Sequence, residues 1–260
     1  MKKVLCMMLA ALTVVSLLTA CGGGSDEMVY AVEGGSAGEA IAQEKGWAIN
    51  SVDDQAKALM EVDSGTSDAA VIDMLMAGAM IGEGTSYPDL KVTETLTEEE
   101  YAIGCRKGSD LAQYINIVLA EAYADGTMAA LAKQYKVAED LIVEQPAATE
   151  FVPSADSDVA YIQGKGKLVV GITNFAPMDY PDANGEWIGF DADLAKLVAQ
   201  KLGVEIEFVT ITWSQKIFEL DGKTIDVVWN GMTLTDETRN GMECTNAYCK
   251  NAQVVVTKAS

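Results

Sequence analysis

The chain has 260 residues, of which 39 are acidic, 18 are basic and none is histidine, and its formal net charge is -21. This charge repels nucleic acid, so we expect no nucleic-acid partner. The lack of histidine excludes Ser-His-Asp and Cys-His catalysis. Because the cysteines also lack a C-x-x-C spacing, we expect no metal and no cofactor.

The first residues indicate export. Lys2 and Lys3 precede an apolar run over residues 4–18, which is short for a membrane span and typical of a signal peptide. The run ends in Leu-Thr-Ala-Cys at residues 18–21, which resembles the bacterial lipobox. We therefore predict a signal peptide over 1–20, lipidation of Cys21, and a flexible tether over 21–27. The protein would be extracytoplasmic and anchored to the cell membrane through this cysteine.

Beyond residue 26, short β-branched runs alternate with amphipathic segments, which predicts an α/β fold with mostly parallel sheets. Helices are expected over 110–124 and over 191–202, where Gly203 is placed to end the second. The segment 146–158 is rich in Pro, Ala and Ser and has no periodicity, so it is predicted to be a linker. Strands are expected at 29–32, 69–72, 101–105, 168–172, 205–209, 225–229 and 253–257.

Two halves of the chain carry motifs of one family. Residues 167–258 contain LVVG at 168–171, NGEWIGFD at 184–191 and IDVVWNGMTLT at 225–235. This half resembles the first half of the polar amino-acid-binding proteins of ABC importers, which have the two-lobed type II periplasmic-binding-protein fold. Residues 30–141 resemble the second half of these proteins, through AVEGGSAGE at 31–39, DAAVID at 68–73 and YAIGCRKGS at 101–109.

The order of the two halves is reversed relative to the family, which implies a circular permutation. Such rearrangement is tolerated where domain termini lie close together at the surface. The resemblance places lobe 2 at 28–99 and lobe 1 at 100–145 plus 159–260, with 146–158 as the linker that joins the ancestral termini. It also implies that only the crossover near 98–105 remains covalent, because the strand at 253–257 would normally continue into the other lobe.

The resemblance implies that an amino acid is bound between the lobes. Asp73 would accept the α-ammonium, although an Asp between a strand and a helix also serves as an N-cap. The ligand carboxylate would meet Gly231 and Thr233 in one lobe and Ser36 with the Ala37 amide in the other. The remaining candidates for ligand contact are Phe175, Trp213, Asn230 and Glu33.

Several of these positions leave alternatives open. Phe175 and Trp213 match the rings that enclose the ligand side chain, although aromatic residues commonly belong to the core. An acid at Glu33 suits a polar or cationic ligand, and the alternative is an exposed residue at a sheet edge. The family usually has arginine where Thr238 stands, whereas here Arg239 follows one residue later, turned by about 100° on a helix. Either Arg239 still reaches the carboxylate, or it is a surface residue and the amides act alone.

The remaining cysteines are Cys105, Cys244 and Cys249. The family fold places Cys105 and Cys249 on neighbouring crossover strands, so they form either a disulfide or buried thiols.

The resemblance predicts a monomeric solute-binding lipoprotein without enzymatic activity, which delivers an amino acid to the membrane permease of an ABC importer. A receptor that reports the ligand to a signalling partner would use the same binding chemistry. A dehydratase on the same fold would need a general acid or base, for which Asp73 and Glu33 are the candidates.

Overall fold

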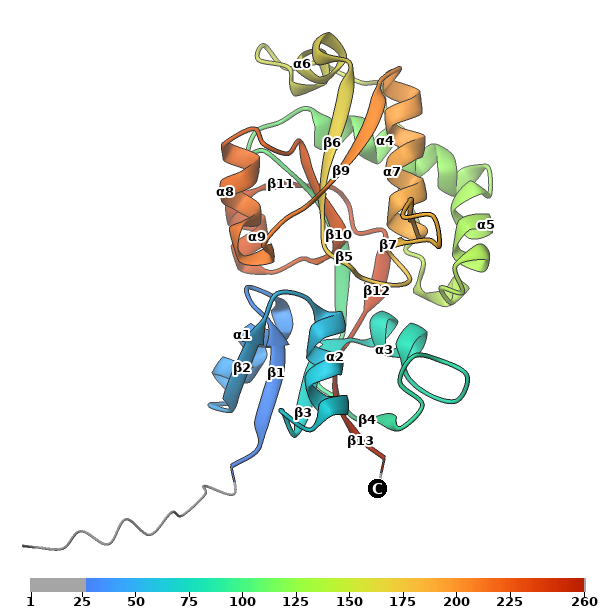
Figure 1. The fold of residues 1–260 in the computed structure, drawn as a ribbon. Coiled ribbons are helices and arrows are strands. Elements are labelled where there is room, and N and C mark those ends of the chain that lie inside the picture. Colours follow the sequence, from blue (N-terminus) through green and yellow to red (C-terminus); the bar gives the residue numbers. More distant parts are fainter. Residues whose placement is uncertain (1–26, 260) are drawn as a thin grey trace, which may run out of the picture.

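The computed structural model describes residues 27–259. The predicted signal peptide, Cys21 and nearly all of the tether therefore lie outside the described residues. The described chain forms two α/β lobes, each built around its own mixed sheet (Figure 1). This arrangement confirms the predicted two-lobed α/β fold.

Lobe 2, the lower lobe in Figure 1, has a five-stranded sheet in the order β2-β1-β3-β13-β4. Strands β1, β2 and β3 are parallel, and β13 runs antiparallel to both β3 and β4. Every residue of β3 is buried, as expected for a parallel strand covered on both faces. The elements are β1 Val29–Glu33, α1 Ala37–Glu44, β2 Ala48–Val52, α2 Gln55–Ser64, β3 Ala69–Asp73, α3 Met74–Met80, β4 Leu90–Thr95 and β13 Gln253–Lys258.

Lobe 1 has a second sheet in the order β11-β5-β10-β6-β9, with β12 paired to β5. The two clearest predicted helices are present as α4 and α7, and α7 ends at Gly203 in the left-handed conformation. The strands are β5 Glu99–Cys105, β6 Lys167–Ile172, β9 Glu205–Thr210, β10 Val227–Thr233, β11 Glu243–Cys244 and β12 Cys249–Asn251, with a small ribbon of β7 Tyr180–Pro181 and β8 Trp187–Ile188. The helices are α4 Leu111–Ala124, α5 Thr127–Gln134, η1 Glu139–Leu141, α6 Asp158–Lys165, α7 Phe190–Leu202, η2 Trp213–Gln215, α8 Lys216–Asp221 and α9 Asp236–Gly241.

The lobes are joined by two covalent connections, one from β4 to β5 and one from β12 to β13. Strand β12 pairs with β5 in lobe 1, whereas β13 begins two residues later and pairs with β3 in lobe 2. The expectation of a single covalent crossover is therefore wrong. The assignment of all residues 159–260 to lobe 1 is also wrong for 253–258, because β13 lies between β3 and β4 in the lobe 2 sheet.

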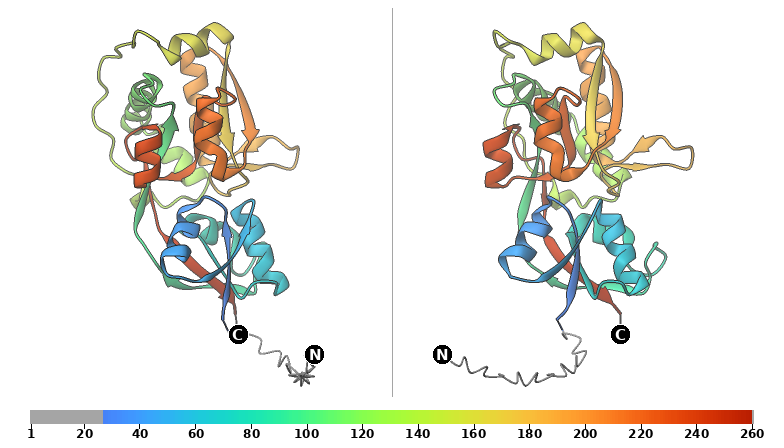
Figure 2. Two further views of the ribbon diagram at one scale, coloured as in Figure 1. Left: turned by 90° about the vertical axis from the view of Figure 1, so that its left-hand side faces the viewer. Right: turned by 60° about the vertical axis from the view of Figure 1, so that its left-hand side comes forward.

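The two ends of the described chain lie in the same sheet and emerge near each other at the base of lobe 2 (Figure 2). Tyr30 in β1 and Thr257 in β13 both pair with Ala69, from opposite sides of β3. Two strand spacings separate them, which is about 10 Å.

The predicted linker runs over lobe 1 and is held there. Asp110 accepts hydrogen bonds from the Ser154 amide, the Ser157 hydroxyl and the Val159 amide. Phe151 packs edge-on against Tyr114, with ring centroids 5.4 Å apart. The segment therefore connects two parts of one lobe and does not lie between the lobes.

The three described cysteines are free thiols. Cys249 pairs with Tyr101, which lies four residues before Cys105 on the same strand. At about 3.3 Å per residue, Cys105 and Cys249 are roughly 13 Å apart, too far for a disulfide. The alternative of buried thiols is confirmed for both residues.

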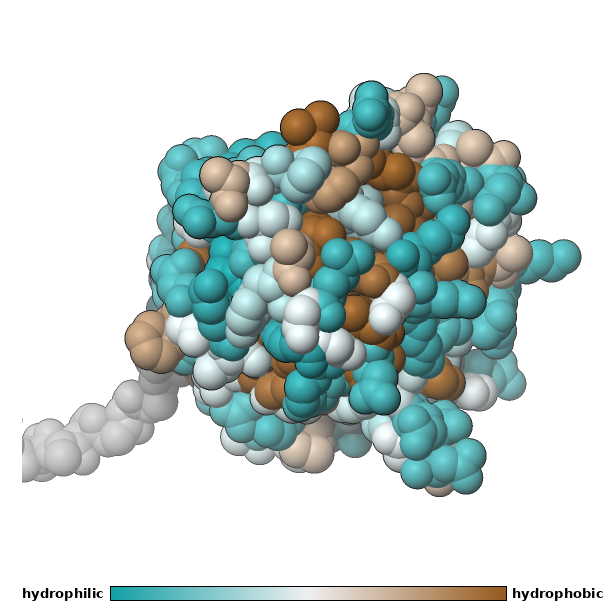
Figure 3. Space-filling view, turned by 90° about the horizontal axis from the view of Figure 1, so that it is seen from above, coloured by the Kyte–Doolittle hydropathy of each residue, from teal (hydrophilic) through white to brown (hydrophobic). Residues whose placement is uncertain are grey.

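Two further features concern the surface of lobe 1 and the length of the helices. Seen from above lobe 1, hydrophilic side chains cover much of the face and apolar ones lie among them (Figure 3). Among residues 27–259, no helix has both the length and the apolar character needed to cross a membrane.

Candidate functional site

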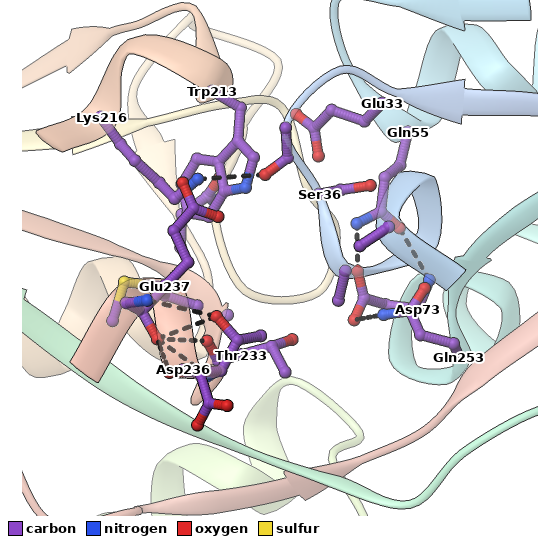
Figure 4. A pocket seen from close by; sticks show the side chains of 18 residues that line it. Glu33, Ser36, Gln55, Asp73, Trp213, Lys216, Thr233, Asp236, Glu237 and Gln253 are labelled. Atoms are coloured by element: carbon purple, nitrogen blue, oxygen red, sulfur yellow. Dashed lines mark hydrogen bonds between the residues drawn. The ribbon is translucent and has the colours of Figure 1, made fainter. Parts of the chain in front are cut away.

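A cavity of about 220 Å³ lies between the two lobes (Figure 4). Its volume is below the roughly 300–1,000 Å³ of pockets for drug-sized ligands, and therefore suits one small solute. Lobe 2 contributes Glu33, Gly35, Ser36, Ala37, Ala40, Gln55, Asp73 and Gln253. Lobe 1 contributes Trp213, Lys216, Asn230, Gly231, Met232, Thr233, Thr235, Asp236, Glu237 and Thr238.

Asp73 ends β3 and is buried in the cavity wall. It occupies the N-cap position of α3, but its side chain makes no capping bond to that helix. Its Oδ1 atom instead accepts hydrogen bonds from the Tyr101 hydroxyl at 2.7 Å, from Gln253 Nε2 at 2.9 Å and from the Asn251 amide. Its Oδ2 atom accepts from the Gln55 amide. Three donors therefore share the two lone pairs of Oδ1, whereas Oδ2 keeps one acceptor position free among the described residues.

A second carboxylate lies beside this network. Glu99, the first residue of β5, accepts from Asn251 at 2.6 Å, from Gln253 at 2.8 Å and from the Thr233 hydroxyl at 2.9 Å, all at Oε1. Burial, followed by the charge of Glu99, raises the pKa of Asp73 well above its usual value. Two acids that share amide donors without a cation between them can be stabilised by an ammonium group.

The N-terminus of α1 supplies donors on the lobe 2 side. Ser36 caps the helix, because its Oγ accepts from the Glu39 amide at 3.1 Å. The Gly35 amide donates to the Glu39 carboxylate at 2.7 Å. The Ala37 amide donates to no other group of the described residues. Because Ser36 and Ala37 both line the cavity, this amide and the Ser36 hydroxyl proton are available to an anion.

Gly231 lines the cavity, but its amide is already used. It donates to the Asp191 carboxylate at 2.7 Å, so the expected role of this amide in carboxylate binding is wrong. Its φ of +55° suits glycine, and a Cβ atom there would lie 2.4 Å from the Phe175 ring. Phe175 itself is 2% exposed, packs edge-on against Tyr101 and is not among the lining residues. The core alternative for Phe175 is the one observed.

The Asn230 side chain also makes all of its hydrogen bonds to other residues of the protein. Its Oδ1 accepts from the Thr173 amide and hydroxyl, and its Nδ2 donates to Asp179 at 2.8 Å and to the Thr173 carbonyl at 3.2 Å. No acceptor or donor position remains for a ligand. Asn230 therefore shapes the cavity wall by holding the end of β6 next to β10.

Arg239 lies outside the cavity. A capping box between Thr235 and Thr238 fixes the first turn of α9, and this turn directs Thr238 into the cavity. Arg239, one residue later, is exposed and lines a different cavity with Glu98 and Glu100. The alternative in which Arg239 is a surface residue is therefore the observed one.

Lys216 is a cation in the cavity that sequence reasoning missed. Its side chain is 2% exposed, its Nζ donates to the Gly35 carbonyl at 3.0 Å, and it lies 5.3 Å from the centre of the Trp213 ring. Burial lowers the pKa of Lys216, and the Glu237 and Glu33 carboxylates oppose that shift. The i,i+3 spacing from Trp213 could have identified it, because residues three apart share one helix face.

Glu33 is buried, so the alternative of an exposed edge residue is wrong. It is the last residue of β1, is 3% exposed and lines the cavity. Its Oε1 atom has no hydrogen-bond partner among the described residues. Burial, and then the charges of Asp73 and Asp54, raise its pKa to about 8.

Residues 168–260 match the family described as bacterial extracellular solute-binding proteins, family 3. This segment is therefore similar to the family 3 solute-binding proteins. Its relatives include the arginine-binding extracellular protein ArtP of Bacillus subtilis, 33% identical over 96 residues, which are 36% of this chain and 37% of ArtP. They also include the L-cystine-binding protein TcyJ of Escherichia coli, 30% identical over 101 residues, which are 38% of each chain.

Among solved structures, the chain is similar over part of its length to the arginine-bound form of a truncated ArgBP from T. maritima. The identity is 43%, the TM-score is 0.30, and the match covers 31% of this chain and 39% of that one. In all three cases the chain matches well under half the length of its relative.

The buried acids predict an unusual pH dependence of stability. Burial raises the pKa of Glu33 to about 8 and that of Asp191 to about 7, above their unfolded values near 4. The folded state therefore binds more protons, and its free energy of unfolding should fall as the pH rises from about 4 to 8. The chain has no histidine to titrate in this range.

Calorimetry of the ligand-free protein should give a lower melting temperature at pH 8 than at pH 5. Glu33→Gln should remove part of this difference, because one of the titrating groups is then absent. A melting temperature that rises over the same interval would contradict the protonated state of these acids.

Proposed function

We propose that the protein binds one amino acid in the cavity between its lobes and delivers it to the permease of an ABC importer. The observation that carries the proposal is the charge arrangement of this cavity. Buried carboxylates without a bound cation line one part of it, and a free helix N-terminal amide with a serine hydroxyl lines another. An α-amino acid presents an ammonium and a carboxylate close together, and complements both features.

The geometry suggests where each group binds. The ammonium would approach Asp73, which lines the cavity and shares the amides of Asn251 and Gln253 with Glu99. The carboxylate would accept from Ser36 and from the Ala37 amide, without a contribution from Arg239. Trp213 would cover the ligand from lobe 1, where it lines the cavity.

The names of the relatives support this class of ligand, since they are proteins named for binding arginine and L-cystine. A binding role also fits the state of the candidate acids better than catalysis does. Asp73 accepts hydrogen bonds from four amide and hydroxyl donors, which hold it in the cavity wall as a binding group.

Thermal-shift screening of the twenty common amino acids, cystine and ornithine should identify a ligand. A ligand at 100 times its Kd adds about 2.7 kcal/mol to the free energy of unfolding. Asp73→Asn should then weaken binding by about 2 kcal/mol or more, because it removes a charge that faces the ammonium.

Asp125→Asn is the matched control, since Asp125 is exposed at the end of α4, does not line the cavity and changes the net charge equally. This control should bind as the natural protein does. If no amino acid raises the melting temperature, the proposed function is wrong.

We also propose that Cys21 carries the lipid anchor, on the lipobox-like sequence before it. Cys21→Ser should leave the protein unlipidated, and therefore found in the soluble fraction or in its precursor form, as judged by fractionation and mass spectrometry. Retention of the mutant in the membrane at the normal mature mass would refute this assignment.

Circular permutation is a further proposal, supported by the reversed order of the family motifs and by the short distance between β1 and β13. A rearranged chain with residues 149–258 first, a short Gly-Ser linker and then residues 28–148 should restore the order seen in the family. It keeps the Asp110 contacts that hold the former linker.

The rearranged chain should fold and bind the same amino acid with an affinity within about threefold, because loop closure costs change slowly with length. Calorimetric titration and circular dichroism would measure this. A rearranged chain that fails to fold would argue that the present order of segments is needed for the structure.

A further inference from the structure

Glu33 has an unsatisfied carboxylate oxygen that faces the cavity. Figure 4 shows its side chain at the cavity wall, on the same side as Ser36 and Gln55. Only 3% of the residue is exposed, and Oε1 has no partner among the described residues. A buried acceptor without a donor is costly, because water that would otherwise bind it has been removed. A donor supplied by the ligand would satisfy it.

The cavity wall also has more acids than bases. Glu33, Asp73, Asp236 and Glu237 line it, and among the described lining residues Lys216 is the one base. A ligand with a neutral side chain has no net charge, so it would leave this excess unchanged. A ligand with one additional positive charge would reduce it.

Lys216 does not neutralise Glu33 directly. Its Nζ is bonded to the Gly35 carbonyl at 3.0 Å and lies over the Trp213 ring. The ion pairs of the described residues include none between Lys216 and Glu33. Among the acids near Lys216, Glu237 has the larger influence and Glu33 the smaller.

We propose that the ligand is an amino acid with a basic side chain, and that Glu33 binds the ammonium or guanidinium group at the end of that side chain. This inference rests on the proposed amino-acid binding and adds a second cation site to the one at Asp73.

A neutral polar side chain is the main competing ligand, because a protonated Glu33 could donate a hydrogen bond to a carbonyl oxygen. Arginine and citrulline separate the two cases, since citrulline has nearly the same shape but replaces the guanidinium with an uncharged urea group. Lysine and glutamine form a second pair with the same contrast.

Calorimetric titration of the full chain should show arginine binding at least 30-fold more tightly than citrulline, or lysine at least 30-fold more tightly than glutamine. In Glu33→Gln this preference should fall to about threefold or less. Glu44→Gln is the matched control, because Glu44 is exposed at the end of α1, does not line the cavity, and changes the net charge equally. It should keep the preference of the natural protein.

Titration against pH gives an independent readout. The acids that act on Glu33 are Asp73 and Asp54, and the nearby cation is Lys216, whose Nζ donates to the Gly35 carbonyl. Because Glu33 must lose a proton to bind a cation, the affinity for the basic amino acid should increase from pH 6 to pH 8 and protons should be released. Glu33→Gln should reduce both effects.

The outcomes separate this inference from the proposed function. If citrulline or glutamine binds as tightly as its cationic counterpart, the protein is an amino-acid receptor without a second cation site, and this inference is wrong. If Glu33→Gln keeps the full preference, a different residue binds the side-chain cation. If no amino acid binds at all, the inference and the proposed function both fail.

Discussion

The Asp73 carboxylate, which lines the cavity, accepts hydrogen bonds from residues at both connections between the lobes. Its donors are Tyr101 on β5, Asn251 at the end of β12 and Gln253 at the start of β13. Each belongs to a strand that enters or leaves the hinge. In the proposed function, a ligand that binds at Asp73 would therefore act directly on both connections between the lobes.

The cavity is lined by several acids, two of which are brought together at the buried ends of neighbouring strands. Glu33 and Asp73 are the last residues of two adjacent parallel strands, β1 and β3, whose carboxyl ends open on the same side of the sheet. Ligand sites form at such edges in α/β folds. The electrostatic cost of keeping these acids close is met by amide donors at Asp73, whereas Glu33 has none at Oε1.

The sequence predicted the elements better than it predicted the contacts between them. Helices α4 and α7 have clear apolar faces and end at turn residues, so their positions could be read from their periodicity. The partner of β13 could not, because a buried apolar strand pairs equally well with either sheet until the register of its neighbours is known.

The same limit applies to the site. Asp73, Ser36 and Trp213 could be placed by motif, since each stands at the end of an element. The displacement of Arg239 depended on the Thr235–Thr238 capping box, and the use of the Gly231 amide depended on Asp191, 40 residues earlier in the chain. Such contacts follow from three-dimensional packing and leave no pattern in the local sequence.

The position of β13 has a consequence for the order in which the protein can fold during synthesis. In the lobe 2 sheet, β13 lies between β3 and β4, yet it is translated after every other strand of the described chain. Until then β4 has no neighbouring strand, and one edge of β3 is open. Neither lobe can be completed early, because β5 pairs with β10, which is translated about 120 residues later. The nascent chain therefore exposes unpaired strand edges through most of its translation, a state that favours chaperone binding or aggregation.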